Sequence, residues 1–134
     1  TKLKPGQFIH SIRIPISNKN IFKAYKISKR FDDDISSVCA AFNFEIKNKK
    51  IKNVKIAYGG MAAIPKRATY CEKVLFNSLI TRKVIDEAKN ALEKDFKPID
   101  DMRASGKYRK IIAKNLLEKC FLEINEKKLI RIHS

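Results

Sequence analysis

The sequence predicts an α+β fold, in which an antiparallel sheet of three to four strands is followed by three helices packed on one face. Two observations support this prediction. Apolar residues recur with a period of two up to about residue 60, and with a helical period after Pro65. The length of 134 residues suits one compact unit, so we expect residues 1–134 to form a single domain.

Two strands are expected near the N-terminus. Ile12 and Ile14 alternate with polar neighbours, which indicates a strand around residues 8–16. Pro15 would restrict that strand to an edge or an end of the sheet. A polar turn then leads to a second extended run, Ile21 to Ile27.

The clearest strand covers residues 38–46, where large or buried-type apolar positions alternate with Cys39, Ala41, Asn43 and Glu45. Its apolar positions are Val38, Ala40, Phe42, Phe44 and Ile46. Residues 47–50 form a polar hairpin connection, and a return strand carries Val54, Ile56 and Tyr58 on one side. The return strand stops at Gly59-Gly60, where we expect a positive φ angle.

The helical period begins with a short stripe made of Ala68, Cys71 and Leu75. Thr81 is a suitable N-cap for a second helix, which Lys97-Pro98 would end. The apolar face of this helix holds Val84, Ile85, Ala88, Ala91 and Leu92.

Ser105 is a suitable cap for the last helix. The apolar stripe of that helix consists of Ile112, Ala113, Leu116, Leu117, Cys120 and Phe121. The tail from Asn125 has no strong pattern, and residues 128–132 suit either a stray strand or a disordered end.

The formal net charge of +16 suggests an acidic partner, yet its distribution does not favour nucleic acid. Lysines are dispersed along the chain and far outnumber arginines, whereas base and phosphate recognition favour clustered arginine. We therefore do not expect nucleic acid as a partner. We do not expect a membrane either, because no run approaches the roughly 18 apolar residues of a membrane helix. A non-catalytic basic α+β module that binds nucleic acid is the alternative.

The cysteines and the missing motifs limit the chemistry of the chain. Cys39, Cys71 and Cys120 are too far apart for a zinc or iron–sulfur site, and we expect three buried thiols in a reducing compartment. The chain has no nucleotide-binding glycine motif, no nucleophile elbow and no HExxH. We therefore assign no catalytic residue and no metal ligand.

Three polar segments, in order and in register, carry a resemblance to a known family. They are YKISKRFDDDIS (residues 25–36), YGGMAAIPKRA (58–68) and DMRASGKYR (101–109). Together they resemble the C-terminal part of the FAD-binding region of xanthine dehydrogenase, above all the small subunit of the bacterial enzymes. The wider family includes the flavoprotein subunits of CO dehydrogenase and of related molybdenum hydroxylases. The resemblance runs from about Gly6 to Ile124.

The resemblance implies a domain that caps an FAD site in a xanthine-dehydrogenase-like molybdenum hydroxylase of purine metabolism. It would help to pass electrons from FAD to NAD, with the iron–sulfur clusters and the molybdenum cofactor elsewhere in a cytoplasmic complex. The implied partners are an upstream FAD domain of the same polypeptide and a molybdenum-binding large subunit. Because the upstream FAD domain and the iron–sulfur segment are absent from residues 1–134, we expect the fragment alone to be inactive.

The resemblance also implies the site residues. The residue matching Lys26 contacts FAD, as does the backbone matching Ile9, and the loop matching residues 27–36 borders the face where NAD docks. In that loop, the carboxylate of Asp33 would disfavour the added negative charge of the reduced flavin, and Arg30 would oppose this effect.

Less specific explanations stand beside these roles. The three aspartates at residues 32–34 also suit a solvated loop or a cap-like turn. Tyr25 and Phe22 are expected in the core, and Arg103, Ser105 and Tyr108 are expected to anchor the last helix.

Overall fold

The computed structural model describes residues 3–16, 19–30 and 34–126, and it shows strands followed by helices. The strands are β1 (Asn20–Ile27), β2 (Val38–Lys47), β3 (Lys50–Gly59) and β4 (Lys66–Arg67). The helices are α1 (Thr69–Leu75), α2 (Arg82–Asp95) and α3 (Gly106–Glu126). This order confirms the predicted α+β class.

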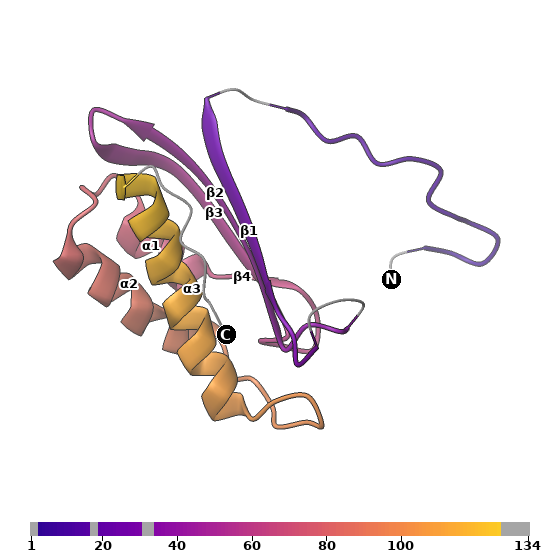
Figure 1. The fold of residues 1–134 in the computed structure, drawn as a ribbon. Helices are drawn as coiled ribbons and strands as arrows, with labels where there is room; N and C mark the ends of the chain where they lie inside the picture. Colours follow the sequence, from indigo (N-terminus) through magenta and orange to yellow (C-terminus); the bar gives the residue numbers. More distant parts are fainter. Residues whose placement is uncertain (1–2, 17–18, 31–33, 127–134) are drawn as a thin grey trace.

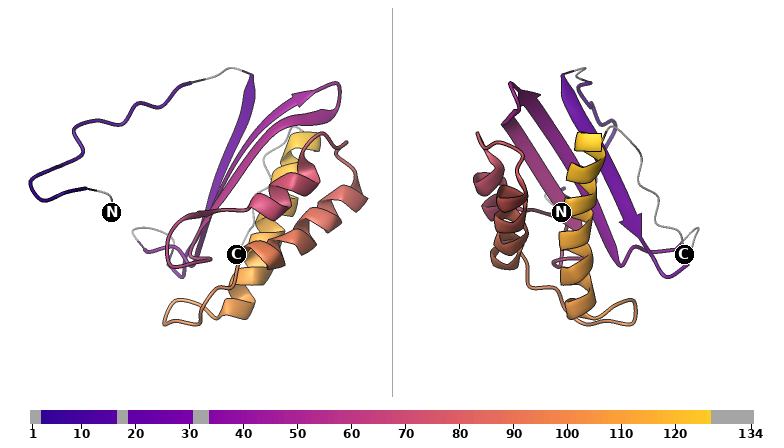
Figure 2. Two further views of the ribbon diagram at one scale, coloured as in Figure 1. Left: turned by 180° about the vertical axis from the view of Figure 1, so that it is seen from behind. Right: turned by 60° about the vertical axis from the view of Figure 1, so that its left-hand side comes forward.

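The four strands form one antiparallel sheet in the order β1-β2-β3-β4. All three helices lie on the same side of the sheet, and no described helix or strand covers the other side (Figures 1 and 2). The register places Lys26 beside Cys39, and Cys39 beside Gly59. We call the uncovered side the bare face.

A two-residue turn joins β2 to β3. Asn48 and Lys49 have φ angles of 50° and 60°, and positive φ at both central residues is typical of the type I′ turn, whose twist matches that of a hairpin. The ladder then slips by one residue between Glu45 and Ile46, which produces a bulge at that end of the hairpin.

Aromatic rings fill the layer between the sheet and the helices. The ring of Phe42 lies 5.8 Å from that of Tyr58 in an edge-on contact, and the ring of Phe44 lies 5.2 Å from that of Phe121 on α3. The Tyr58 hydroxyl donates a hydrogen bond to the carbonyl oxygen of Ala113 at 2.9 Å, so this buried polar group is satisfied. These contacts fix α3 across the middle of the sheet.

Two helix starts follow the predicted caps, and the third depends on a distant residue. Thr81 Oγ1 accepts from Val84 N at 3.3 Å at the start of α2, and Ser105 Oγ accepts from Tyr108 N at 3.2 Å at the start of α3. Helix α1 has no side-chain cap of its own. Instead, Asp95 at the end of α2 accepts hydrogen bonds from the first turn of α1.

The Asp95 carboxylate is 3% exposed. Its two oxygens accept from Tyr70 N at 2.9 Å and from Cys71 N at 3.0 Å. The last turn of one helix therefore caps the first turn of the preceding one. Because this contact is tertiary, it ties α1 and α2 together as a unit.

The predicted strand at residues 8–16 is wrong, since none of these residues belongs to a strand. Alternation predicts a strand only where a neighbouring strand supplies hydrogen bonds, and the described chain supplies none to this segment. Residues 3–16 run away from the body of the domain (Figure 1). Their apolar side chains are exposed, with Ile12 and Ile14 both at 77%.

Two core predictions also fail, and both concern the bare face. Phe22 is 64% exposed, and Cys39 is exposed, whereas Cys71 and Cys120 are buried as expected. A period of two separates the two faces of a strand but does not tell which face the helices cover. The predicted tail strand at residues 128–132 lies outside the described residues. Within the described part, no helix has the length and hydropathy needed to cross a membrane.

Candidate functional site

Lys26 is the last residue of β1 whose side chain lies on the bare face. Its neighbours across the sheet are Cys39 and Gly59, and the next rung holds three alanines, Ala24, Ala41 and Ala57. Because these neighbours are small, the Lys26 side chain stands above a flat, largely apolar surface. This end of the sheet can therefore receive a planar group, with one cationic side chain at its border.

The loop that follows β1 is closed at its base. Ser37 N donates to the carbonyl oxygen of Ile27 at 2.7 Å, so residues 28–36 leave the sheet and return at the same point. Inside the loop, Asp34 accepts from Arg30 N at 3.2 Å and from Ile35 N at 2.9 Å. These backbone donors, with that of Arg30 the strongest, lower the pKa of Asp34 below its ordinary value.

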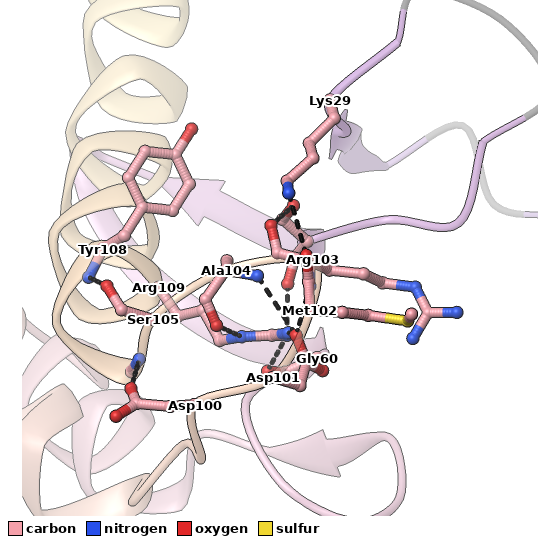
Figure 3. Close-up of polar contacts among 12 residues, drawn as sticks. Lys29, Gly60, Asp100, Asp101, Met102, Arg103, Ala104, Ser105, Tyr108 and Arg109 are labelled. Atoms are coloured by element: carbon pink, nitrogen blue, oxygen red, sulfur yellow. Dashed lines mark hydrogen bonds and ion pairs between the residues drawn. The ribbon is translucent and has the colours of Figure 1, made fainter.

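A second loop, residues 100–105, contacts the first one. Lys29 Nζ donates to the carbonyl oxygen of Met102 at 2.8 Å, as Figure 3 shows. Ser37 Oγ donates to the carbonyl oxygen of Arg103 at 3.5 Å. An open groove between the two loops is lined by Lys29, Arg30, Asp34, Ile35, Met102 and Arg103. The contact brings the first and third of the recognised segments together.

Arg109 on α3 lies beneath this junction and is only 3% exposed. Its Nη1 donates to the carbonyl oxygens of Ser37 at 2.6 Å and Gly60 at 2.7 Å, and its Nη2 pairs with Asp101 Oδ1 at 2.6 Å (Figure 3). The guanidinium therefore joins the base of the first loop, the end of β3 and the second loop. We call this set of contacts the Arg109 junction.

Gly60 is required at the junction for two reasons. Its φ angle is 78°, which confirms the positive φ expected at the end of the return strand. A Cβ atom at this position would also lie 2.3 Å from the carbonyl oxygen of Ser37 and 2.9 Å from Arg109 Nη1. Asp101 is held in turn by Arg103 N at 2.8 Å and Ala104 N at 3.1 Å, and these donors lower the pKa of Asp101.

The structure separates the predicted site residues. Lys26 is the last bare-face residue of β1, and Arg30 lies four residues further on, where its guanidinium pairs with Asp34 at 3.6 Å. Ile9 is 65% exposed in the N-terminal segment, and no described contact joins it to Lys26. Asp33 lies outside the described residues. The cap-like alternative for the aspartates holds for Asp34, which accepts two backbone N–H groups.

Sequence reasoning assigned no role to Arg109. A lone arginine in a helical pattern usually indicates a solvated face, so its burial gave no local signal. The pairing of an early Asp101 with Arg109 eight residues later, around the Ser105 cap, was the available clue. It predicts a loop folded back onto the first turns of a helix.

Comparison with known proteins places this arrangement in a family. A family model described as the CO dehydrogenase flavoprotein C-terminal domain matches residues 23–124, which include both loops and the Arg109 junction. The chain belongs to this family. The resemblance seen in the three segments is thereby confirmed.

The relatives are dehydrogenases of more than one kind. The chain is 28% identical over 127 residues to the glyceraldehyde dehydrogenase medium chain of Sulfolobus acidocaldarius, covering 92% of this chain and 44% of the relative. It is 35% identical over 100 residues to the xanthine dehydrogenase of Emericella nidulans, covering 72% of this chain and 7% of the relative. The chain thus spans less than half the length of these curated relatives.

Solved structures share the fold. The carbon monoxide dehydrogenase of Hydrogenophaga pseudoflava superimposes with a TM-score of 0.71 at 19% identity, over 78% of this chain and 36% of that one. That structure is described as lacking the Mo-pyranopterin moiety of its molybdenum cofactor. At this identity the likeness establishes the architecture of the domain.

Proposed function

We propose that this chain is the C-terminal domain of an FAD-binding polypeptide, and that its bare face closes one side of the FAD site in a molybdenum-containing oxidoreductase. The observation that carries the proposal is the one-sided cover of the sheet in a member of a flavoprotein domain family. A sheet with one uncovered face, edged by a lysine and floored by alanine, cysteine and glycine, supports contact with another layer.

The described residues fit one wall of such a site. Lys26 offers a cation to an anionic or carbonyl-bearing part of the ligand, and the rung of Cys39 and Gly59 allows close approach of a ring. The sequence carries no glycine-rich nucleotide-binding motif, so the pyrophosphate would be held by the other domain. FAD, when bound, would take up electrons one or two at a time and pass them to an acceptor.

Each predicted residue has a part in this proposal. Lys26 binds the ligand, and Arg30 with Asp34 holds the loop after β1 in a neutral pair, so the loop adds little net charge at that point. Asp33 belongs to the same loop, and its place near the flavin is a prediction of the resemblance alone. The backbone of Ile9 would reach FAD only after the N-terminal segment has docked on a partner.

The exposed N-terminal segment supports an upstream FAD domain of the same polypeptide as that partner. Ile12, Ile14 and Ile16 are 77%, 77% and 92% exposed, an unusual density of apolar surface for an isolated chain. Docking of residues 3–16 on a preceding domain would bury these side chains and bring the bare face against the FAD site.

The finer assignment follows the named relatives. We propose a xanthine-dehydrogenase-like cytoplasmic enzyme that oxidises a purine and reduces NAD, with iron–sulfur clusters and a molybdenum-binding large subunit elsewhere in the complex. The relative from Emericella nidulans supports the purine substrate, whereas the medium chain from Sulfolobus acidocaldarius supports an aldehyde. Steady-state assays of the complete enzyme with xanthine and with glyceraldehyde, each with NAD as acceptor, decide between them.

The test of the FAD site is Lys26→Ala in the complete flavin-binding polypeptide. We expect lower FAD occupancy, because the cation at the edge of the bare face is lost. The matched control is Lys55→Ala, on the same face two rungs away, beside Asn43. FAD content per polypeptide, measured by absorbance after gel filtration, is expected to fall only in the first variant. Equal content in both variants would remove Lys26 from the site.

A further inference from the structure

We propose that Arg109 is a positioning residue for FAD, which holds the end of the sheet that carries Lys26 in place from the opposite face. The inference rests on the proposed function, because it assigns to Arg109 the geometry of that same site. Arg109 itself is buried beneath the junction and lies on the helix side of the sheet, so it would act without touching the ligand.

The contacts of Arg109 lead directly to the rung that carries Lys26. That rung consists of Lys26, Cys39 and Gly59. Arg109 donates to the carbonyl of Gly60, which follows the rung on β3, and to that of Ser37, which precedes it on β2. Both residues lie just beyond the same end of the rung, so two of its three strands are bound there to one guanidinium.

The same guanidinium reaches the third strand of the rung through one intermediate bond. Ser37, whose carbonyl accepts from Arg109, donates its own N–H to the carbonyl of Ile27. Ile27 directly follows Lys26 in the chain. The point at which the loop of residues 28–36 leaves and re-enters the sheet is thus set by Arg109.

The geometry of the junction is specific to arginine. Nη1 donates to two carbonyls, Nη2 pairs with Asp101, and Nε donates to the carbonyl oxygen of Ala104 at 3.5 Å; a planar fork can satisfy these directions at once. A lysine ammonium would keep the charge but not all of these directions. Since Ser37 O and Gly60 O are held beneath the sheet end, loss of the fork leaves acceptors without their donor and lets that end relax.

A purely structural role is separated from a positioning role by a second arginine. Arg67 forms a forked pair with Glu72 at 2.6 Å for both contacts, at the β4 and α1 side of the domain. Its side chain is 47% exposed, so it controls for the change from arginine to lysine itself, and it has no contact with the loop after β1 among the described residues. Arg67→Lys is therefore the matched control for Arg109→Lys.

The experiment measures FAD binding and flavin absorption in the complete flavin-binding polypeptide. We expect Arg109→Lys to raise the FAD dissociation constant about tenfold, the equivalent of one lost hydrogen bond to a charged group, and to shift the visible flavin bands. Arg67→Lys is expected to leave both unchanged. Unchanged FAD affinity and unchanged bands in Arg109→Lys would overturn the inference.

Two further measurements keep the result decisive. If Arg109→Lys does not fold, Asp101→Asn replaces it. Asp101 is more exposed than Arg109, and the change removes the charge that orients the guanidinium. Unchanged flavin bands in Asp101→Asn count against the inference. If the unmodified polypeptide binds no FAD, the proposed function fails. Hydrogen exchange of Ser37 N in residues 1–134 then tests Arg109 separately, and exchange no faster in Arg109→Lys than in Arg67→Lys would overturn its role.

Discussion

Replacing Asp95 with alanine should destabilise α1, although Asp95 belongs to a different helix, α2. The carboxylate is 3% exposed and is the acceptor for Tyr70 N and Cys71 N, and α1 has no side-chain cap of its own. Without the carboxylate, the buried N–H of Cys71 loses its acceptor, at a cost of about 2 kcal/mol, and the less buried N–H of Tyr70 costs about 1 kcal/mol.

One opposing effect reduces this loss. Asp95 is the last residue of α2, where a negative charge meets the negative end of the helix dipole, so its removal returns about 0.5 kcal/mol. The expected loss of unfolding free energy is therefore about 2.5 kcal/mol. With a denaturant slope of about 1.5 kcal/mol/M, typical of a small domain in urea, the midpoint falls by about 1.7 M.

The assay is urea unfolding of residues 1–134, followed by circular dichroism. The control is Asp86→Ala on the same helix. It removes a carboxylate that pairs with Arg82 at 3.3 Å on the surface. Exposed pairs contribute little, so its midpoint should barely move. If both variants shift the midpoint equally, the cap from α2 to α1 does not stabilise the fold as argued. Asp95→Asn, which keeps one acceptor oxygen, should fall between the two.

Two other predictions concern Gly60 and the thiols. Gly60→Ala should lower the free energy of unfolding by at least about 2 kcal/mol, because it adds a Cβ 2.3 Å from Ser37 O. Gly6→Ala is the control, since Gly6 has a similar φ of 80° with no atom within 4 Å and carries the backbone strain alone. Equal thermal shifts for the two variants would contradict the crowding argument. Iodoacetamide should modify Cys39 in the folded chain and spare Cys120, whose pKa burial raises to about 12; mass spectrometry that finds Cys120 alkylated as fast as Cys39 would count against the described core.

The sheet and the helices were predictable because their signals are local. Strand β2 alternates over its whole length, and the caps at Thr81 and Ser105 use bonds within one turn. Strand β4 was missed, since its two exposed residues, Lys66 and Arg67, carry no apolar pattern. Its pairing with Ala57 and Tyr58 is set by the return of the chain toward α1, which a local pattern does not encode.

The candidate site was less predictable, because its key contacts are distant in sequence. Arg109 meets Ser37 across 72 residues, and Asp95 meets Cys71 across 24. An aspartate in the last turn of a helix opposes the dipole, and this local conflict was a signal that Asp95 serves another element. No comparable conflict marks Lys26, so its place on the bare face required the register of the sheet.

Strand β1 is an outer edge of the sheet within the described chain, and its composition has a consequence for assembly. Open edges invite a second sheet to join, which leads toward aggregation. Lys23 pairs with Glu123 at 3.1 Å on the helix side, whereas Lys26 projects from the bare face of β1 and places a positive charge at this edge, against any strand that would add to it. A lysine at the edge thus disfavours pairing of this strand with a second sheet, and it leaves the bare face as the surface on which another domain can pack.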